Sequence, residues 1–511
     1  MWVVMRSALF LTPMIGLCFF WQLGAVPLFD LDEGAFSAAT WEMLQRGDFV
    51  TTYLNGIPRF DKPILIYWLQ AASISLFGLQ EWALRLPSAL AATAWVWVTF
   101  QFAKPRYGIE AAHVATLMVA SSIMIVLVGR AATADALLNL LIVLALFDIW
   151  RYWEHPNPWP LYRAFLWMGL GFLCKGPIAV FIPLLVSFYL YASQGQWRQW
   201  LRAAFNPIGW MLFLAVAAPW YILEYQAQGQ AFIDGFFLKH HVGRFTTTME
   251  GHGGNPAYYL LALPLILLPF SGLLPVLLFN LYSSLRGTLD RFLWVWFIAV
   301  FVSFSFSNTQ LPHYLLYGIT PLLLLLARYA SPHTPPWLMV APALVLVGLT
   351  LFLPELLQMV AAHNPSAYTQ GLLEQANAVM GTSYRIAVGL TLLGLLILWI
   401  WHTLGSFHCL LGVATLQTLL LVTVLIPTVA AIQQNAVRDA ALFARQHLAG
   451  QTIVMEGVNM PSFTVYRGQV TPKRAPQAGE YVFSKASHLQ PASAYRIVFR
   501  QGGLVLAERQ E

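Results

Sequence analysis

Long apolar runs separated by short polar connectors dominate this chain of 511 residues. About 20 consecutive apolar residues are enough for a helix to cross the hydrocarbon core of a bilayer. The first run is longer than the apolar core of a signal peptide, so we expect it to be retained as a helix. In all, the pattern predicts thirteen spans, near residues 7–24, 84–103, 109–128, 133–152, 161–174, 176–193, 206–223, 257–281, 290–307, 312–330, 336–354, 383–402 and 408–430.

The long segment between the first two spans, residues 25–83, has helical patterns of its own. Apolar residues recur at helical spacing from Glu33 to Arg46, where Asp30 or Asp32 is expected to cap the helix and Gly47 to end it. A second helix is expected from Pro63 to near Gly78 and is too short to cross a membrane. We therefore expect two interfacial helices that hold polar residues at the level of the lipid headgroups.

The tail after the last span, residues 431–511, has a different pattern. Thr452–Met455, Tyr481–Phe483 and Tyr495–Phe499 are typical of short strands, and Pro461–Tyr466 of a helix start. The sequence thus predicts two domains: a transmembrane domain over 1–430 and a small α/β domain over 431–511.

Composition agrees with a membrane protein. Hydrophobic residues make up 58% of the chain and charged residues 10%, whereas soluble domains carry about 25% charge. The net charge of +6 comes from basic residues scattered singly in connectors. Such scatter is typical of topology signals, and it argues against a nucleic-acid partner.

Basic residues also predict the orientation, because they gather in cytoplasmic loops. With the N-terminus inside, the short outside connectors hold only Arg130 and Lys175. An odd number of spans then places the tail outside. The inside loops hold Lys104, Arg106, Arg151, Arg163, Arg198, Arg202, Arg286, Arg291 and Arg328.

Polar residues that could take part in catalysis or binding gather on the predicted outer side. This one-sided clustering suggests a reaction site at the outer boundary of the membrane. The group comprises Asp32, Glu33, Lys62, Arg85, Arg130, Asp135, Lys175, His240, His241 and Arg244.

The pair Asp32-Glu33 is the most distinctive of these features. One interpretation is helix capping alone, with the carboxylates placed favourably at a helix N-terminus. The other is general-base chemistry by a carboxylate that the same helix start fixes in place. The two roles are compatible, and we predict Asp32 and Glu33 as the catalytic carboxylates.

Several basic residues could meet an anionic group, and each also has a plainer explanation. Lys62 precedes Pro63 and suits a phosphate, or it is a lysine that reaches to the interface. Lys175 between two spans needs a partner, or it is a turn residue in water. Residues 239–245 could bind phosphate or metal, or form a solvated loop.

Motifs for nucleotide binding are missing from the sequence. It holds no Walker loop, no Gly-rich dinucleotide motif after a strand and no nucleophile elbow. A donor carried on a lipid phosphate fits the pattern better, because its phosphate needs cations at the interface and its tail needs an apolar groove.

A set of short motifs, ordered along most of the chain, resembles a known family. The chain resembles bacterial GT-C glycosyltransferases similar to the aminoarabinose transferase that modifies lipid A, and more distantly protein O-mannosyltransferases. The motifs are Asp32-Glu33-Gly34 through Leu44, Gly47-Asp48-Phe49, Asn55-Gly56, Phe60-Asp61-Lys62-Pro63, Arg85-Leu86-Pro87-Ser88-Ala89, Lys175-Gly176-Pro177, His241-Val242-Gly243-Arg244-Phe245 and Leu311-Pro312-His313-Tyr314.

The resemblance implies a GT-C fold with thirteen membrane helices, two interfacial helices in the first periplasmic loop and a small periplasmic C-terminal domain. It implies a multi-pass protein of the bacterial inner membrane with a periplasmic active site. The donor would be a sugar on polyprenyl (undecaprenyl) phosphate, transferred with inversion to lipid A, another glycan or a protein.

The resemblance also assigns roles to individual residues. Asp32 would be the catalytic carboxylate. A divalent metal, zinc or magnesium, would be held by Asp61 and His241. The predicted substrate-binding residues are Lys62, Arg85, Lys175, Arg244 and Tyr314.

Two other classes of protein compete with an enzyme. A transporter or flippase for a lipid-linked sugar would place polar sites near the bilayer midplane and show inverted repeats. Here the charges gather at one rim, and no such repeat is visible. A membrane scaffold with a partner-binding tail would leave the carboxylates of the first loop without a role.

Overall fold

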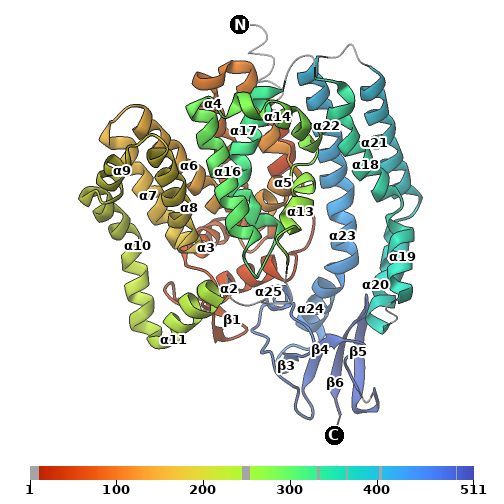
Figure 1. The fold of residues 1–511 in the computed structure, drawn as a ribbon. Coiled ribbons are helices and arrows are strands. Elements are labelled where there is room, and N and C mark those ends of the chain that lie inside the picture. Colours follow the sequence, from red (N-terminus) through yellow and green to blue (C-terminus); the bar gives the residue numbers. More distant parts are fainter. Residues whose placement is uncertain are drawn as a thin grey trace.

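A computed structural model describes residues 11–243, 254–330, 334–363, 366–401, 405–490 and 492–510. It is a tall bundle of helices standing above a small sheet formed near the end of the chain (Figure 1). Elements of the first loop lie between these two parts. The mainly helical fold class is confirmed.

The helices of the bundle follow the predicted apolar runs closely. Among the described residues, five helices are long and apolar enough to cross a membrane, or eight if each bent pair is counted as one span. The bundle helices are α4 (Glu81–Ser121), α5 (Ile123–Arg130), α6 (Asp135–Glu154), α7 (Pro158–Lys175), α8 (Ile178–Ala192), α10 (Pro207–Gln228), α13 (Tyr258–Ile266), α14 (Leu274–Phe279), α16 (Thr288–Ser305), α17 (Ile319–Tyr329), α18 (Pro336–Leu351), α21 (Thr382–Ile400), α22 (Ser406–Leu420) and α23 (Ile426–Gln433).

Shorter helices connect or extend these elements. They are η1 (Gly16–Phe20), α9 (Trp197–Ala204), α11 (Gln230–Phe232), η2 (Ile233–Val242), η3 (Phe270–Leu273), α15 (Leu281–Ser284), η4 (Pro312–Gly318), α19 (Leu353–His363), α20 (Ala367–Val379) and η5 (Leu421–Leu425). Figure 1 shows α19 and α20 reaching down from the bundle toward the sheet.

The helix α4 contains the expected break between the second and third spans. Gly108 has a φ of 83° inside it, in the left-handed region that favours glycine, so two helices meet there at a kink. A second break, at Ser122, bends α4 and α5 by 58° within the predicted span 109–128. This second bend was not predicted, and it brings α5 to the cavity described below.

The first loop folds as predicted in outline. Helix α2 (Asp32–Arg46) ends at Gly47, which has a φ of 66°. Helix α3 (Leu65–Phe77) begins two residues after Pro63, the predicted start. A short hairpin of β1 (Tyr53–Leu54) and β2 (Ile57–Pro58) joins the two helices.

The C-terminal region builds a four-stranded sheet in the order β3-β4-β6-β5, with β3 and β4 parallel and the other pairs antiparallel. The three predicted strands and the predicted helix are present, while the last strand, β6, was missed. The elements are α24 (Asn435–His447), β3 (Ile453–Met455), α25 (Ser462–Arg467), β4 (Tyr481–Lys485), η6 (Ala492–Ala494), β5 (Tyr495–Gln501) and β6 (Leu504–Arg509).

Candidate active site

Asp32 is the first residue of α2, where the chain leaves the first apolar segment. The predicted capping by Asp30 or Asp32 is wrong, because Leu31 is the N-cap and no side chain caps the helix. Asp30 instead accepts hydrogen bonds from Ser462 of α25. Within the described residues, the Asp32 carboxylate is exposed and accepts no hydrogen bond, so it is available to a ligand.

Glu33, the second carboxylate of the pair, is buried in an ion pair with Arg85 of α4. The Arg85 guanidinium donates to both carboxylate oxygens, at 2.7 and 2.8 Å. The backbone N–H of Ala132 also donates to Glu33, at 2.8 Å, and that of Phe29 at 2.8 Å. Glu33 is only 3% exposed, so it holds the fold together at this point rather than acting as a second catalytic carboxylate.

Arg85 has no donor left for a substrate. Besides its two bonds to Glu33, the guanidinium donates to the carbonyl oxygens of Leu23, Val26 and Pro27 at 2.8–2.9 Å. These five bonds use all five N–H groups of an arginine. In this arrangement Arg85 fixes the segment before α2, and its predicted contact with a substrate stays a prediction.

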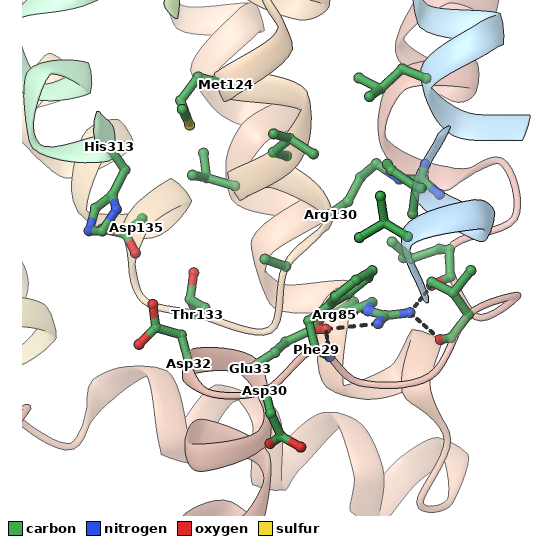
Figure 2. Close-up of a pocket in the computed structure, with 18 of the residues that line it drawn as sticks. Phe29, Asp30, Asp32, Glu33, Arg85, Met124, Arg130, Thr133, Asp135 and His313 are labelled. Atoms are coloured by element: carbon green, nitrogen blue, oxygen red, sulfur yellow. Dashed lines mark hydrogen bonds and ion pairs between the residues drawn. The ribbon is translucent and has the colours of Figure 1, made fainter. Parts of the chain in front are cut away.

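A cavity of about 560 Å³ opens beside Asp32. Its polar end is lined by Asp32, Thr133, Asp135 and His313, and Figure 2 shows the Asp32 carboxylate below Thr133, on the side where Asp135 lies. Apolar side chains from α5, η5 and α23 form another wall: Met124, Leu127, Val128, Leu421, Leu425, Ile426 and Val429. The cavity thus joins a polar end to an apolar surface.

An ion pair between Asp135 and Lys175 lies at the polar end. Asp135 begins α6, and Lys175 ends α7, so the two helix ends meet there. The Nε2 atom of His313 is 3.9 Å from the Asp135 carboxylate. The ammonium of Lys175 also lies over the rings of Tyr314 and Tyr317, at 5.6 and 5.7 Å from their centroids.

Tyr314 is buried at 6% exposure and packs edge-on against His313. Its ring lies next to the Lys175 ammonium, so the structure brings this predicted residue to the polar end of the cavity as part of the surroundings of Lys175.

Lys62 approaches the same place from the first loop. Its Nζ donates to the Asp61 carbonyl oxygen at 3.1 Å, and its charge acts on both Asp135 and His313. The fold therefore brings together Asp32, Lys62 and Lys175, which are far apart in the sequence.

Asp61 is held by a guanidinium and a histidine. Its Oδ2 accepts from Arg59 at 3.1 Å, and its Oδ1 lies 2.6 Å from Nε2 of His240. Burial by itself would raise the pKa of Asp61, but the hydrogen bond from His240 and the charges of Arg59 and Lys62 outweigh it. The pKa of this carboxyl is therefore well below its ordinary value.

The predicted metal site fits these contacts poorly. Asp61 pairs with His240, and the side chain of His241 is outside the part of the chain that the structure describes. A cation bound at Asp61 would meet the Arg59 guanidinium on the same carboxylate. No three His, Cys, Asp or Glu side chains of the described residues group so as to hold a metal.

Other predicted and missed residues complete the site. Arg244 lies outside the described residues, so its predicted phosphate contact stays a prediction. Thr133 was missed by sequence reasoning, while Asp135 and His313 were noted in the outer polar group and in a family motif without being assigned a role. Asp135 had the signal of an acid at the outer end of a predicted span.

The chain is similar in sequence to several known proteins. The family model described as dolichyl-phosphate-mannose-protein mannosyltransferase matches residues 61–223. An uncharacterized protein of Aquifex aeolicus is 30% identical over 336 residues, which cover 64% of this chain and 74% of that protein. The undecaprenyl phosphate-alpha-4-amino-4-deoxy-L-arabinose arabinosyl transferase of Yersinia pestis is 29% identical over 314 residues, or 60% of this chain.

Solved structures share the fold. ArnT from Cupriavidus metallidurans in the apo state superposes with a TM-score of 0.82 and 21% identity, covering 99% of this chain and 98% of ArnT. The archaeal oligosaccharyltransferase AglB from Archaeoglobus fulgidus gives a TM-score of 0.51 at 11% identity, covering 95% of this chain and 69% of AglB. The chain thus resembles the ArnT-like glycosyltransferases in sequence and shares the fold of ArnT.

This ArnT-like chain is a multi-pass membrane protein, and the predicted family resemblance is confirmed. The alignment covers 55% of the length of the Yersinia relative. The family match at residues 61–223 includes Lys62, Asp135 and Lys175, whereas Asp32 and His313 come from outside it. The polar end of the cavity thus combines residues inside and outside the matched segment.

Proposed function

We propose that this chain transfers a sugar from a polyprenyl (undecaprenyl) phosphate carrier to an acceptor at the periplasmic face of the bacterial inner membrane. The acceptor is lipid A, another glycan or a protein. The observation that carries the proposal is one cavity that joins Asp32 and nearby cations to an apolar wall. The name of the Yersinia relative and the ArnT structure bound to undecaprenyl phosphate support this choice of carrier.

The cavity suits the two parts of such a donor. Lys62 and Lys175 supply positive charge for a phosphate at the polar end, and we assign Arg244 to the same phosphate. Tyr314 keeps the Lys175 ammonium in place by packing beside it. The apolar side chains of α5, η5 and α23 receive the start of the polyprenyl tail.

The chemical step is an inverting displacement at the anomeric carbon. The acceptor oxygen attacks this carbon while its proton passes to the Asp32 carboxylate. The bond from the anomeric carbon to the phosphate oxygen breaks, and the phosphate leaves with the bonding electron pair. Lys62 and Lys175 stabilise the charge that develops on this leaving group. No step passes through a metal.

Topology completes the proposal. Thirteen spans with the N-terminus inside would place the first loop, the cavity and the C-terminal region on one side of the membrane, the periplasm. The clustering of Asp32, Lys62, Asp135 and Lys175 at one end of the bundle supports a single site on that side.

Transfer from a radiolabelled lipid-linked sugar in proteoliposomes tests the proposal. Asp32→Asn should lower the rate of transfer by about 10²–10⁴-fold, because a positioned base contributes that much. Folding should be unaffected, since the Asp32 carboxylate is exposed. The matched control is Asp234→Asn, which changes an exposed carboxylate of η2 outside the cavity.

Two outcomes would contradict the proposal. Wild-type rates in Asp32→Asn would remove Asp32 from catalysis. Movement of the labelled carrier across the membrane without sugar transfer would instead support a flippase.

A further inference from the structure

Helix α25 of the C-terminal region packs directly against the start of α2. The contact is so close that only a glycine fits at position 34. A Cβ atom there would lie 1.8 Å from an Asp30 carboxylate oxygen and 2.9 Å from the backbone nitrogen of Ser462. Two segments more than 400 residues apart in the sequence are therefore in contact next to Asp32.

Asp30 and Ser462 form the polar part of this contact. The backbone N–H of Ser462 donates to one Asp30 carboxylate oxygen at 3.0 Å, and its hydroxyl donates to the other oxygen. Ser462 is fully buried. Figure 2 shows the Asp30 side chain pointing down, away from the cavity that Asp32 faces.

Tyr466, one turn further along α25, makes the second contact. Its hydroxyl accepts from the backbone N–H of Leu28 at 2.8 Å and donates to Glu81 at 3.1 Å. Val465, between these two residues, packs in the same apolar cluster as Leu28. Three residues of α25 thus hold the chain just before Asp32.

The position of Asp32 depends on this support. Its carboxylate accepts no hydrogen bond within the described residues, so the backbone on either side determines where it points. Glu33 anchors that backbone to Arg85 on the side of the bundle, and Asp30 anchors it to Ser462 on the side of the sheet. A displacement of about 1 Å in a reacting group can lower a rate by about 10²-fold.

We propose that α25 is a positioning element of the active site, in which Ser462 and Tyr466 hold the segment that places the Asp32 carboxylate. The rate of sugar transfer then depends on the C-terminal region through these two side chains. The inference rests on the proposed function for its rate readout. It assigns the C-terminal region a role in the chemical step, which an acceptor-binding tail would not have.

Ser462→Ala and Tyr466→Phe in the full-length protein test the inference. Ser462→Ala should lower kcat by about 10-fold, the effect of losing one buried hydrogen bond. KM for the lipid-linked donor should stay within about two-fold, because neither side chain lines the cavity. Thr464→Val is the control, since the Thr464 hydroxyl on the same helix is buried without a hydrogen-bond partner among the described residues.

Changes at Asp30 separate positioning from general stability. Asp30→Ala removes both hydrogen bonds from Ser462, whereas Ser462→Ala keeps the one from the backbone, so Asp30→Ala should lower kcat at least as much as Ser462→Ala. The double variant should be no slower than Asp30→Ala, because nothing of the contact is left to remove. Asp30→Asn keeps an acceptor and gains a donor for Ser462, so it should recover most of the kcat that Asp30→Ala loses.

The inference is overturned if Ser462→Ala and Tyr466→Phe keep the kcat of the wild type while only their Tm falls. Amide hydrogen exchange of residues 28–36 tests the same contact without any lipid-linked sugar present. Exchange should rise in Ser462→Ala and not in Thr464→Val, and equal exchange would also overturn the inference. If the wild type transfers no sugar at all, the proposed function fails, while the exchange experiment still decides the role of α25.

Discussion

Two buried ion pairs flank the cavity, and they differ in how many of their polar atoms are already bonded. In the pair Glu33–Arg85, all five guanidinium N–H groups have protein acceptors, and both carboxylate oxygens have donors. In the pair Asp135–Lys175, the acid lines the cavity beside His313. Glu33 and Arg85 also border the cavity, but their polar atoms are already bonded within the protein, whereas Asp135 faces the place where a ligand would bind.

The comparison teaches that charge and position alone do not identify a site residue. Arg85 and Lys175 are both cations at helix ends on the same side of the bundle, and both were predicted to bind substrate. Their acceptors tell them apart, because a cation whose donors are all used has nothing to offer a phosphate.

Breaking the ion pair between Glu33 and Arg85 should have the largest effect of the changes proposed here. We expect this effect on the stability of the fold. Arg85→Met leaves the Glu33 carboxylate buried without its cation. Removing one partner of a buried ion pair costs about 3–5 kcal/mol of unfolding free energy. Thermal unfolding of the purified protein should show a large fall in Tm, or the protein should fail to accumulate.

Two further variants check this prediction. Arg198→Met changes an exposed arginine and should leave Tm almost unchanged. Glu33→Leu with Arg85→Met removes both charges and should recover part of the lost stability. A Tm for Arg85→Met equal to that of Arg198→Met would show that the pair Glu33–Arg85 does not stabilise the fold.

Breaking the ion pair between Asp135 and Lys175 should act mainly on the rate of sugar transfer. Lys175→Met removes an ammonium that we place on the leaving phosphate, so kcat should fall by about 10²-fold. Its Tm should fall less than that of Arg85→Met, because Asp135 borders the cavity and can be solvated there. Transfer assays beside Lys104→Met, which changes an exposed lysine of α4, give the reference. Unchanged kcat in Lys175→Met would make this pair structural as well.

Asp30 sharpens the comparison, because it is a carboxylate with no cationic partner among the described residues. Burial raises its pKa to about 7, although hydrogen bonds from Ser462 oppose the rise and the charge of Glu33 adds to it. The charged groups Asp32, Glu33 and Arg85 line the same cavity as Asp30. Ser462 faces the Asp30 carboxylate from α25.

The sign of the pH effect follows from this raised pKa. Between the ordinary pKa of 3.8 and about 7, the folded protein holds a proton that the unfolded chain releases. Stability from Asp30 is therefore lost as pH rises through 7 and regained as pH falls. Relative to Asp30→Asn, the wild-type Tm should be a few degrees higher at about pH 5 than at about pH 8. Parallel Tm profiles would show that Asp30 does not titrate in this range.

Much of the fold could be predicted from the sequence, because its signals are local. The apolar run lengths predicted the helices of the bundle, and Gly47 predicted the end of α2. The bend at Ser122 was missed, because it interrupts an apolar run with two serines whose hydroxyls bond back to Leu117 and Met118. The strand β6 was missed because apolar and polar residues do not alternate along Leu504–Arg509.

The candidate site was predicted only in part, because its contacts are remote in sequence. Nothing near Asp30 points to Ser462, which lies 432 residues away. His240 and His241 are neighbours, but a one-residue step on a helix turns a side chain by about a quarter of a turn or more. The sequence could not tell which of them meets Asp61, and the structure shows that His240 does.

The size of the cavity sets how much of a carrier lipid the protein can contact. About 560 Å³ is the volume of an ordinary small-molecule site. A sugar, a phosphate and the first isoprene units would fill it, so most of a long tail would stay among the surrounding lipids. Selection would then act on the head of the carrier, and donors with shortened tails should serve almost as well as the full-length one.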